Sequence, residues 1–389
     1  MLSLRQYGVI RKTAAALVVG AVTMGSAQAE WFVSVQDGKQ VLDNGVIRTA
    51  PGDDALVLIE MKDGRPAIRA EVAVPTSVIG PPTSVAVSPD GSLALVTAGF
   101  RRDAADPGKT VENDQVSVVD LAALPPRLVG SVRVGKAPGG VSISPDGRLA
   151  LVANHNDGTV SVLAIEGKTV REVDQVRLAD AKAGPMHAVF TPDGRRALLT
   201  RDGDHRVTVL AVDGLRVTAT SRDLYPGQRP DCIDVRAQGD FAVVANIGKG
   251  QGDADTLSLI DLSVEPPRVI DTVSVGQTPE GAFFSPDGRF VGVNVMEGSN
   301  KPTSSPFYQS RGNFALLKVE GRRLVPLARA PIGRWAQGLA FSSDARFVLV
   351  QNTAEQEIQV LRIDNERLVD DGQRLPLKGS PAALRPVFR

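Results

Sequence analysis

Three residues that could perform acid–base chemistry stand near the starts of successive segments of the chain: His187, Arg229 and Glu280. A neutral imidazole can act as a general base, and a guanidinium can hold the carboxylate of a substrate. Glu280, or the neighbouring Asp231, could supply the second acid or base. We therefore predict His187, Arg229 and Glu280 as catalytic residues, if the protein is an enzyme.

Other hydrogen-bonding residues occur at related positions. Asp231 lies in the same segment as Arg229, whereas Trp335 and Gln337 lie at the start of the next repeat after Glu280, and polar groups are concentrated between residues 187 and 337. One-sided polarity of this kind favours a ligand site over uniform structural filling. The sequence predicts these ligand-binding residues: Asp231, Trp335, Gln337, Asn154, Asn246 and Asn294.

Metal and nucleic-acid chemistry have weaker support. His155 and His205, with Asp157, Asp202 or Asp204, could bind a divalent metal, but no metal-ligand spacing supports them. We expect no metal site and no cofactor, with a divalent metal as the alternative. Lys plus Arg and Asp plus Glu both number 44, without long runs of one sign, which argues against a nucleic-acid partner.

A repeated turn organises the chain that carries these residues. Its clearest copy is Ser-Pro-Asp-Gly at 144–147, between runs that alternate apolar with small or polar residues, a pattern typical of a β-hairpin. Copies recur every 45 to 57 residues at 88–91, 191–194 and 285–288, with degenerate copies at 236–239 and 342–345. This period predicts six blades of a β-propeller.

The two ends of the chain supply a seventh blade. Residues 379–384 match the opening of each repeat, but the chain stops before the hairpin that should follow. Three further apolar segments lie at the other end, at 31–35, 55–59 and 66–72. We therefore expect an all-β, seven-bladed β-propeller in which N- and C-terminal segments close one blade and leave no exposed sheet edge.

The repeat resembles a known family. Leu-Val-Ala-Asn at 151–154 and Val-Val-Ala-Asn at 243–246, each followed by a third strand, look like the YVTN β-propeller repeat, which overlaps with the seven-bladed lactonase-like propellers. The resemblance covers about residues 72 to 385. The stretch Gly184-Pro185-Met186-His187 is similar to the Gly-Pro-His motif that contributes to the active site of lactonase-type propellers, whereas Gln228-Arg229-Pro230-Asp231 departs from that family's pattern.

The geometry of such propellers implies where a site would lie. The inner strands line a central channel, so the residue after each repeat's opening proline should face one rim: Thr83, Gly139, Met186, Asp231, Glu280, Gln337 and Ala382. The loops between second and third strands share this rim. They are long at 98–115, 246–255 and 294–313, and long loops on one face of a regular scaffold often carry function.

The N-terminus predicts export. Basic residues, an apolar stretch from 13 to about 25 and Ala27-Gln28-Ala29 are typical of a signal peptide cleaved before Glu30. We therefore divide the chain into a signal peptide, 1–29, and a propeller, 30–389. The mature protein is expected to be periplasmic or secreted, without a membrane span. Cys232 is the single cysteine, so stability must come from burial instead of a disulfide.

Two functions remain open on these observations. The first is a ligand- or partner-binding scaffold that uses the loop-capped face of its funnel to hold a small molecule or a periplasmic protein. The second, implied by the resemblance, is a lactonase-type hydrolase or isomerase that acts on a small carboxylate or lactone in the same funnel. We expect a monomer in either case.

Overall fold

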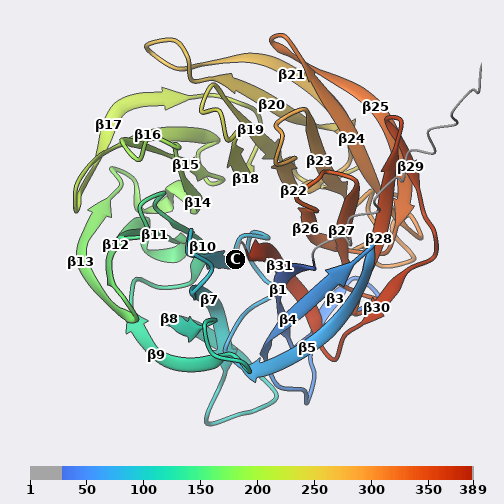
Figure 1. The fold of residues 1–389 in the computed structure, drawn as a ribbon, viewed down its shortest axis with the longest axis horizontal. Coiled ribbons are helices and arrows are strands. Elements are labelled where there is room, and N and C mark those ends of the chain that lie inside the picture. The colour runs from blue at the N-terminus through green and yellow to red at the C-terminus, as the bar shows by residue number, and fades with distance from the viewer. Residues whose placement is uncertain (1–28, 388–389) are drawn as a thin grey trace, which may run out of the picture.

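The computed structural model describes residues 29–387, which form seven antiparallel sheets arranged around a central axis (Figure 1). The predicted signal peptide lies outside the described residues, except for its last residue. None of the helices within residues 29–387 has the length and hydropathy that a membrane crossing requires. The all-β, seven-bladed propeller is confirmed.

The seven sheets are numbered here as blades in chain order, each from its inner to its outer strand. Blade 1 contains β6 (Val85–Val87), β7 (Leu93–Arg102), β8 (Thr110–Asp120) and β9 (Arg127–Arg133). Blade 2 contains β10 (Pro138–Ile143), β11 (Leu149–Asn154), β12 (Thr159–Glu166) and β13 (Thr169–Arg177). Blade 3 contains β14 (Pro185–Phe190), β15 (Arg196–Arg201), β16 (Arg206–Asp213) and β17 (Arg216–Leu224).

The next three blades repeat this order. Blade 4 contains β18 (Pro230–Val235), β19 (Phe241–Asn246), β20 (Asp255–Asp261) and β21 (Arg268–Gly276). Blade 5 contains β22 (Pro279–Phe284), β23 (Phe290–Val295), β24 (Gly312–Glu320) and β25 (Arg323–Ile332). Blade 6 contains β26 (Ala336–Phe341), β27 (Phe347–Asn352), β28 (Glu357–Asp364), β29 (Arg367–Val369) and β30 (Arg374–Pro376).

Blade 7 joins the two ends of the chain, as the sequence predicts. Its inner strand is β31 (Ser380–Val387), followed outward by β1 (Glu30–Asp37), β4 (Ala55–Lys62) and β5 (Arg65–Ala73). β1 pairs with β31 from Trp31 opposite Val387 to Asp37 opposite Ser380. In the described part of the chain, three small elements lie outside the blades: the hairpin of β2 (Gln40–Asp43) and β3 (Val46–Thr49), and the 3-10 helices η1 (His155–Asp157) and η2 (Ala181–Ala183).

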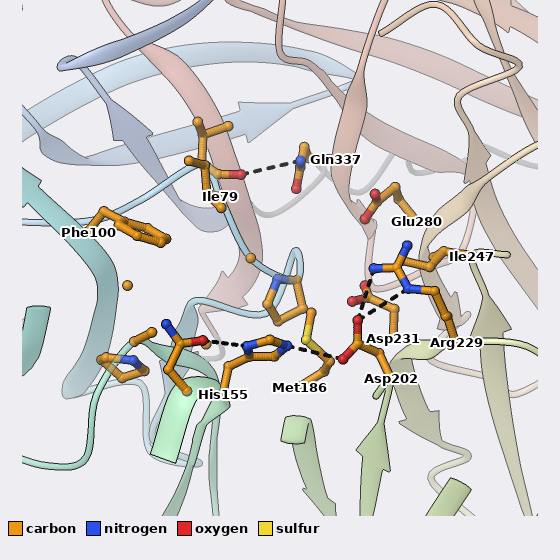
Figure 2. Close-up of a pocket in the computed structure, with 18 of the residues that line it drawn as sticks. Ile79, Phe100, His155, Met186, Asp202, Arg229, Asp231, Ile247, Glu280 and Gln337 are labelled. Carbon is orange, nitrogen blue, oxygen red and sulfur yellow. Dashed lines mark hydrogen bonds and ion pairs between the residues drawn. The ribbon is translucent and has the colours of Figure 1, made fainter. Parts of the chain in front are cut away.

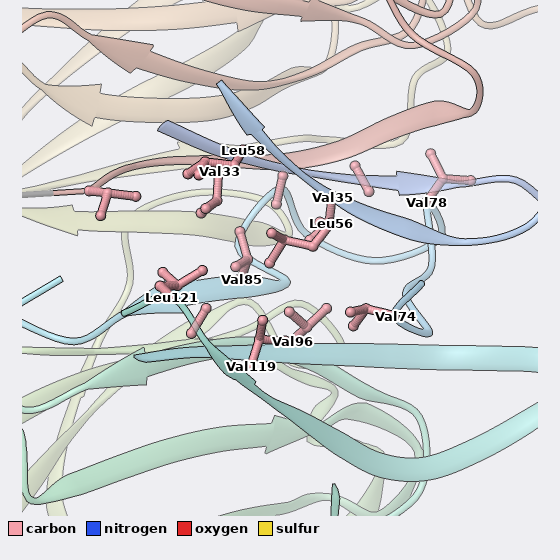
Figure 3. Close-up of a cluster of buried hydrophobic side chains, with 14 of the residues drawn as sticks. Val33, Val35, Leu56, Leu58, Val74, Val78, Val85, Val96, Val119 and Leu121 are labelled. Carbon is pink, nitrogen blue, oxygen red and sulfur yellow. The ribbon is translucent and has the colours of Figure 1, made fainter. Parts of the chain in front are cut away.

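The core is divided among the blade interfaces. Within residues 29–387, each of seven buried hydrophobic clusters lies mainly between two neighbouring blades. Figure 3 shows the cluster where Val33 and Leu58 of blade 7 face Val85 and Val119 of blade 1. A single blade therefore has no complete core of its own, and closure of the ring buries the last interface.

One hydroxyl stabilises five of the six copies of the repeated turn in the described residues. The Ser144 hydroxyl donates to the Asp146 carboxylate at 2.5 Å and accepts the N–H of Leu149 at 2.9 Å. Gly147 has φ 72°, which favours glycine. The same hydroxyl-to-aspartate bond is present at Ser88 and Asp90, Thr191 and Asp193, Ser285 and Asp287, and Ser342 and Asp344.

We expect Ser144→Ala to lower the free energy of unfolding by about 1–2 kcal/mol, because the buried N–H of Leu149 loses its partner. Urea titration followed by circular dichroism measures this change. Ser310→Ala, at an exposed serine, is the matched control and should change stability by less than about 0.5 kcal/mol. Equal stability of the two variants would contradict the role of the Ser144 hydroxyl.

Candidate functional site

A pocket of about 390 Å³ opens where the inner strands begin; it is called the funnel pocket below. The residue after the opening proline, or after Ala336 in blade 6, lines it in five blades: Gly139, Met186, Asp231, Glu280 and Gln337. Thr83 and Ala382, the corresponding residues of blades 1 and 7, do not line it. The predicted rim position therefore lines the pocket in blades 2 to 6 but not in blades 1 and 7.

The residue immediately before the inner strand has a left-handed backbone in several blades. Ala137, Arg229 and Trp335 have φ of 51°, 54° and 51°, and all three line the funnel pocket. Such φ values are uncommon for residues other than glycine and need local support. At Arg229 the backbone N–H donates to His205 Nδ1 at 3.2 Å, and at Trp335 it donates to the Ser299 hydroxyl at 3.0 Å.

The β2–β3 hairpin lies at the funnel pocket and contacts two other segments of the chain. Ile47 on the β2–β3 hairpin and Phe100 on β7 line the pocket. The Thr49 hydroxyl donates to the Gly108 carbonyl at 3.1 Å, and Asn44 Oδ1 accepts the backbone N–H of Thr303 at 2.8 Å. The hairpin thus contacts both the β7–β8 segment and the loop between β23 and β24.

The expected long loop at 98–115 is largely a hairpin. β7 and β8 continue to pair through Phe100 opposite Glu112 and Arg102 opposite Thr110, so the loop between them spans only 103–109 and is shorter than predicted. The other two long loops, between β19 and β20 and between β23 and β24, are present as expected. The β2–β3 hairpin was not predicted, because no other blade has a copy of it.

A chain of charged groups runs along the wall of the funnel pocket (Figure 2). His155 Nε2 contacts Asp202 Oδ1 at 3.1 Å, and Asp202 Oδ2 accepts from Arg229 Nη2 at 2.9 Å and Nε at 3.3 Å. Burial raises the pKa of Asp202, but hydrogen bonds from His155 and Arg229 outweigh it and lower the pKa. The hydrogen bond to Asp202 raises the pKa of His155.

Two buried carboxyl groups lie beside this chain. Asp231 is 1 % exposed and Glu280 is 9 % exposed, and both line the funnel pocket (Figure 2). Burial raises the pKa of Asp231 to about 7, with Asp202 adding to the shift and Arg229 opposing it. Burial and the charge of Asp231 raise the pKa of Glu280 well above its usual value. Near neutral pH the pair can therefore hold both an acidic proton and a basic carboxylate.

Arg229 retains donors for a ligand. Its Nε and Nη2 bind Asp202, and its Nη1 donates to the Gly248 carbonyl at 3.2 Å. A guanidinium has five N–H groups, so one N–H on each terminal nitrogen is not used by these bonds. The fork is fixed by Asp202, which leaves these donors oriented at little entropic cost when a ligand binds.

Trp335 and Gln337 complete the wall on the blade 6 side. Both residues are buried and line the funnel pocket. Gln337 Nε2 donates to the Val78 carbonyl at 3.4 Å, whereas its Oε1 is buried without a hydrogen-bond partner in the described part of the chain. Asp231 Oδ2 is buried without a partner in the same residues. Both oxygens could accept hydrogen bonds from a polyhydroxylated ligand.

His187 lies away from this group. It is buried, with 3 % of its surface exposed, and it lines a different pocket toward the other end of the channel. Met186, one residue earlier, lines the funnel pocket instead. The structure thus brings Arg229, Asp231, Glu280, Trp335 and Gln337 together and separates His187 from them.

The three candidate asparagines lie outside the funnel pocket, within the blades. Asn154 Nδ2 donates to the hydroxyls of Thr159 at 3.0 Å and Ser161 at 2.9 Å, and Asn246 makes equivalent bonds within blade 4. Asn294 instead donates to the Gln337 carbonyl at 2.8 Å, across the interface between blades 5 and 6. It therefore holds the backbone of a residue that lines the pocket.

His155 and Asp202 belong to the charged chain, although the sequence suggested them only for a metal site. Their positions in the sequence indicated that they could lie close together, because both are in loops between the second and third strands of adjacent blades. His155 contacts Asp202, while His205 Nδ1 accepts the N–H of Arg229. Within residues 29–387, no group of three or more His, Cys, Asp or Glu side chains is placed to hold a metal ion.

Comparisons with known proteins find similarity in structure alone. No family model matches the chain, and no curated protein matches its sequence. The periplasmic gluconolactonase of Pseudomonas aeruginosa superposes with a TM-score of 0.70 at 19% identity, over 93% of this chain and 99% of that one. A proposed 6-phosphogluconolactonase from Bacteroides uniformis gives a TM-score of 0.70 at 17% identity, over 92% and 99%.

The same fold also occurs in a protein of different activity. Hydrazine synthase of Kuenenia stuttgartiensis superposes with a TM-score of 0.61 at 19% identity, over 80% of this chain and 91% of that one. Identities this low establish a common architecture and leave the chemistry to be argued from the site. The protein has the seven-bladed β-propeller fold that the gluconolactonase-like structures share.

Proposed function

We propose that this protein is an exported hydrolase that opens a small sugar-acid lactone in the funnel pocket. The observation that carries the proposal is the buried pair Asp231 and Glu280 beside the guanidinium of Arg229. Similarity to structures named as gluconolactonases supports the substrate class. The predicted signal peptide, together with the periplasmic gluconolactonase among the similar structures, supports export.

The roles follow from the charges in the pocket. The ionised carboxyl of the pair takes a proton from water as its oxygen attacks the lactone carbonyl. The remaining N–H groups of Arg229 stabilise the negative charge that develops on the carbonyl oxygen. The bond between the carbonyl carbon and the ring oxygen then breaks, and the protonated carboxyl gives its proton to that oxygen. The product is an open hydroxy acid.

The pocket wall supports a ring with several hydroxyl groups. The free Gln337 Oε1 and Asp231 Oδ2 can accept hydrogen bonds from hydroxyls, and Trp335 provides an aromatic surface. His155 acts on the site through Asp202, whose carboxylate fixes the guanidinium of Arg229. We assign no step to His187, because it lies in the other pocket.

The proposal is tested by hydrolysis of aldonic acid lactones by the full chain, with the spontaneous rate subtracted. We expect turnover by the unmodified protein and a loss of about 100-fold in kcat/KM in Arg229→Met, since one oxyanion donor is worth about that much. Arg171→Met, at an exposed arginine of β13, is the control and should keep full activity. Unchanged turnover in Arg229→Met would contradict the assignment.

A second candidate is a binding protein without turnover. Exposed apolar side chains on the β2–β3 hairpin and the β23–β24 loop favour this candidate. Val46 and Ile47 of the hairpin are 51% and 39% exposed, and Phe307 of the loop is 40% exposed. Such residues suit a small ligand or a periplasmic protein docked on the rim. Tight binding of an aldonate, with no lactone hydrolysed above the spontaneous rate, would favour this function over the hydrolase.

A further inference from the structure

A second pocket of about 400 Å³ lies at the other end of the channel; it is called the exit pocket below. The first residues of the inner strands line the funnel pocket, and later residues of the same strands line the exit pocket. In β18, for example, Asp231 lines the funnel pocket, whereas Asp234 and Val235 line the exit pocket. The two pockets therefore sit at opposite ends of the same strands.

The exit pocket is mainly apolar but contains a guanidinium. Its wall includes Val141, Phe283, Leu339 and Leu384 around Arg385 of β31. The Arg385 guanidinium lies over the Phe283 ring, 4.5 Å from its centroid, and its Nη1 donates to the Leu384 carbonyl at 2.8 Å. Within residues 29–387, Arg385 takes part in none of the ion pairs, so most of its donors have no protein acceptor.

Three other ionisable groups lie near Arg385, and none of them forms an ion pair with it in the described residues. Asp234 Oδ2 accepts the backbone N–H of Phe284 at 2.8 Å, and burial raises the pKa of Asp234 to about 6. Burial lowers the pKa of His187 to about 3, so its ring is neutral, and burial raises the pKa of Cys232, which stays a thiol. His187 Nδ1 is buried without a hydrogen-bond partner in the described residues.

We propose that the exit pocket binds a small carboxylate with an apolar body, held by Arg385 through its carboxylate and by the ring of Phe283 and the aliphatic wall through the remainder. A guanidinium in apolar surroundings, without an ion-paired carboxylate, gains a charge-assisted partner when such an anion enters. The proposal is independent of the lactone hydrolase, because none of the exit-pocket residues lines the funnel pocket.

The test uses 4-fluorobenzoate as the probe, with the full chain and fluorine NMR titration. We expect 4-fluorobenzoate to bind and the uncharged 4-fluorobenzamide to bind at least 10-fold more weakly. Arg385→Gln should weaken the benzoate at least 10-fold, whereas Glu280→Gln in the funnel pocket should leave it unchanged. Equal binding of acid and amide, or loss of binding in Glu280→Gln alone, would overturn the proposal.

A second variant, Asp234→Asn, shows whether Arg385→Gln loses affinity through the missing charge or through a folding defect at β31. Ionised Asp234 repels an anion, so the benzoate should bind more tightly at pH 5.5 than at pH 7.5, on the two sides of the Asp234 pKa. Asp234→Asn should tighten binding at pH 7.5 and abolish the pH dependence. A purely structural Arg385 would give neither effect, and an affinity for Asp234→Asn equal to that of the unmodified protein at both pH values would contradict the site.

Discussion

We expect Glu280→Gln to lower kcat for the proposed lactone hydrolysis by about 100-fold or more, because positioned acid–base groups contribute factors of this size. Glutamine keeps the shape of the side chain but can neither give up nor take up a proton. Glu280 is almost fully buried in the funnel pocket, and the charge of Asp231 helps to raise its pKa. Asp231→Asn should cause a loss of the same order, since the two carboxyls act as one unit.

Matched variants separate chemistry from folding. Glu172→Gln changes an exposed glutamate on β13 and should leave kcat unchanged. Removal of a buried carboxyl whose pKa is raised should not destabilise the protein at neutral pH, so the melting temperature of Glu280→Gln should equal or exceed that of the unmodified protein. A kcat within threefold of the unmodified protein would show that Glu280 takes no part in the reaction.

Lys39→Met lowers the free energy of unfolding by about 3–5 kcal/mol, the usual cost of breaking a buried ion pair by removing one partner. Lys39 is 3% exposed, and its Nζ lies 3.2 Å from Asp37 Oδ2 and 2.9 Å from Asp54 Oδ2. The ammonium also donates to the Thr76 carbonyl. Without it, two carboxylates face each other where blade 7 meets the segment that leads to blade 1.

The effect of Lys39→Met should depend on pH. Burial raises the pKa of Asp37 to about 6, while Lys39 opposes the shift. Below that pKa the carboxyl is protonated, so loss of the lysine should cost less at pH 5 than at pH 8. Urea denaturation at both values measures the difference, and Lys62→Met, at an exposed lysine, is the control. A loss below about 1 kcal/mol at pH 8 would contradict the importance of this network.

The architecture could be predicted because its signals are local and repeated. The hydrogen-bonded turn of residues 144–147 in blade 2 recurs in blades 1, 3, 5 and 6, so the period of the chain counts the blades. The closure of blade 7 followed from an unpaired inner strand at one end of the chain and three strands at the other. The β2–β3 hairpin has no copy elsewhere, so repetition could not reveal it.

The lining of the funnel pocket could be predicted in part, for reasons of strand geometry. The rim position identified Asp231, Glu280 and Gln337 because the same position of each inner strand faces the same end of the channel. A neighbouring residue can face elsewhere: Met186 lines the funnel pocket and His187 the exit pocket. Likewise, Asn294 precedes the last residue of β23 and contacts blade 6, whereas Asn154 ends β11 and bonds within its own blade.

The electrostatic properties of the site depend on distances and burial that spacing along the chain does not contain. Asp202 and Arg229 are far apart in sequence but share a hydrogen bond of 2.9 Å. The pKa of Asp231 rises to about 7 because the folded ring excludes water from it and places Asp202 nearby. A sequence shows which residues can titrate, whereas the packed structure determines their pKa values.

The pH dependence of kcat/KM for lactone hydrolysis, measured for the unmodified protein and for Asp231→Asn, tests the proposed mechanism most directly. Two coupled carboxyls that share one proton predict a bell-shaped profile, because the base is lost at low pH and the acid at high pH. In Asp231→Asn the alkaline limb should disappear from the residual activity. The one limb that remains should report Glu280, with a pKa below that of the alkaline limb of the unmodified protein, because the charge of Asp231 no longer raises the pKa of Glu280. Identical profiles for the two proteins would contradict the account.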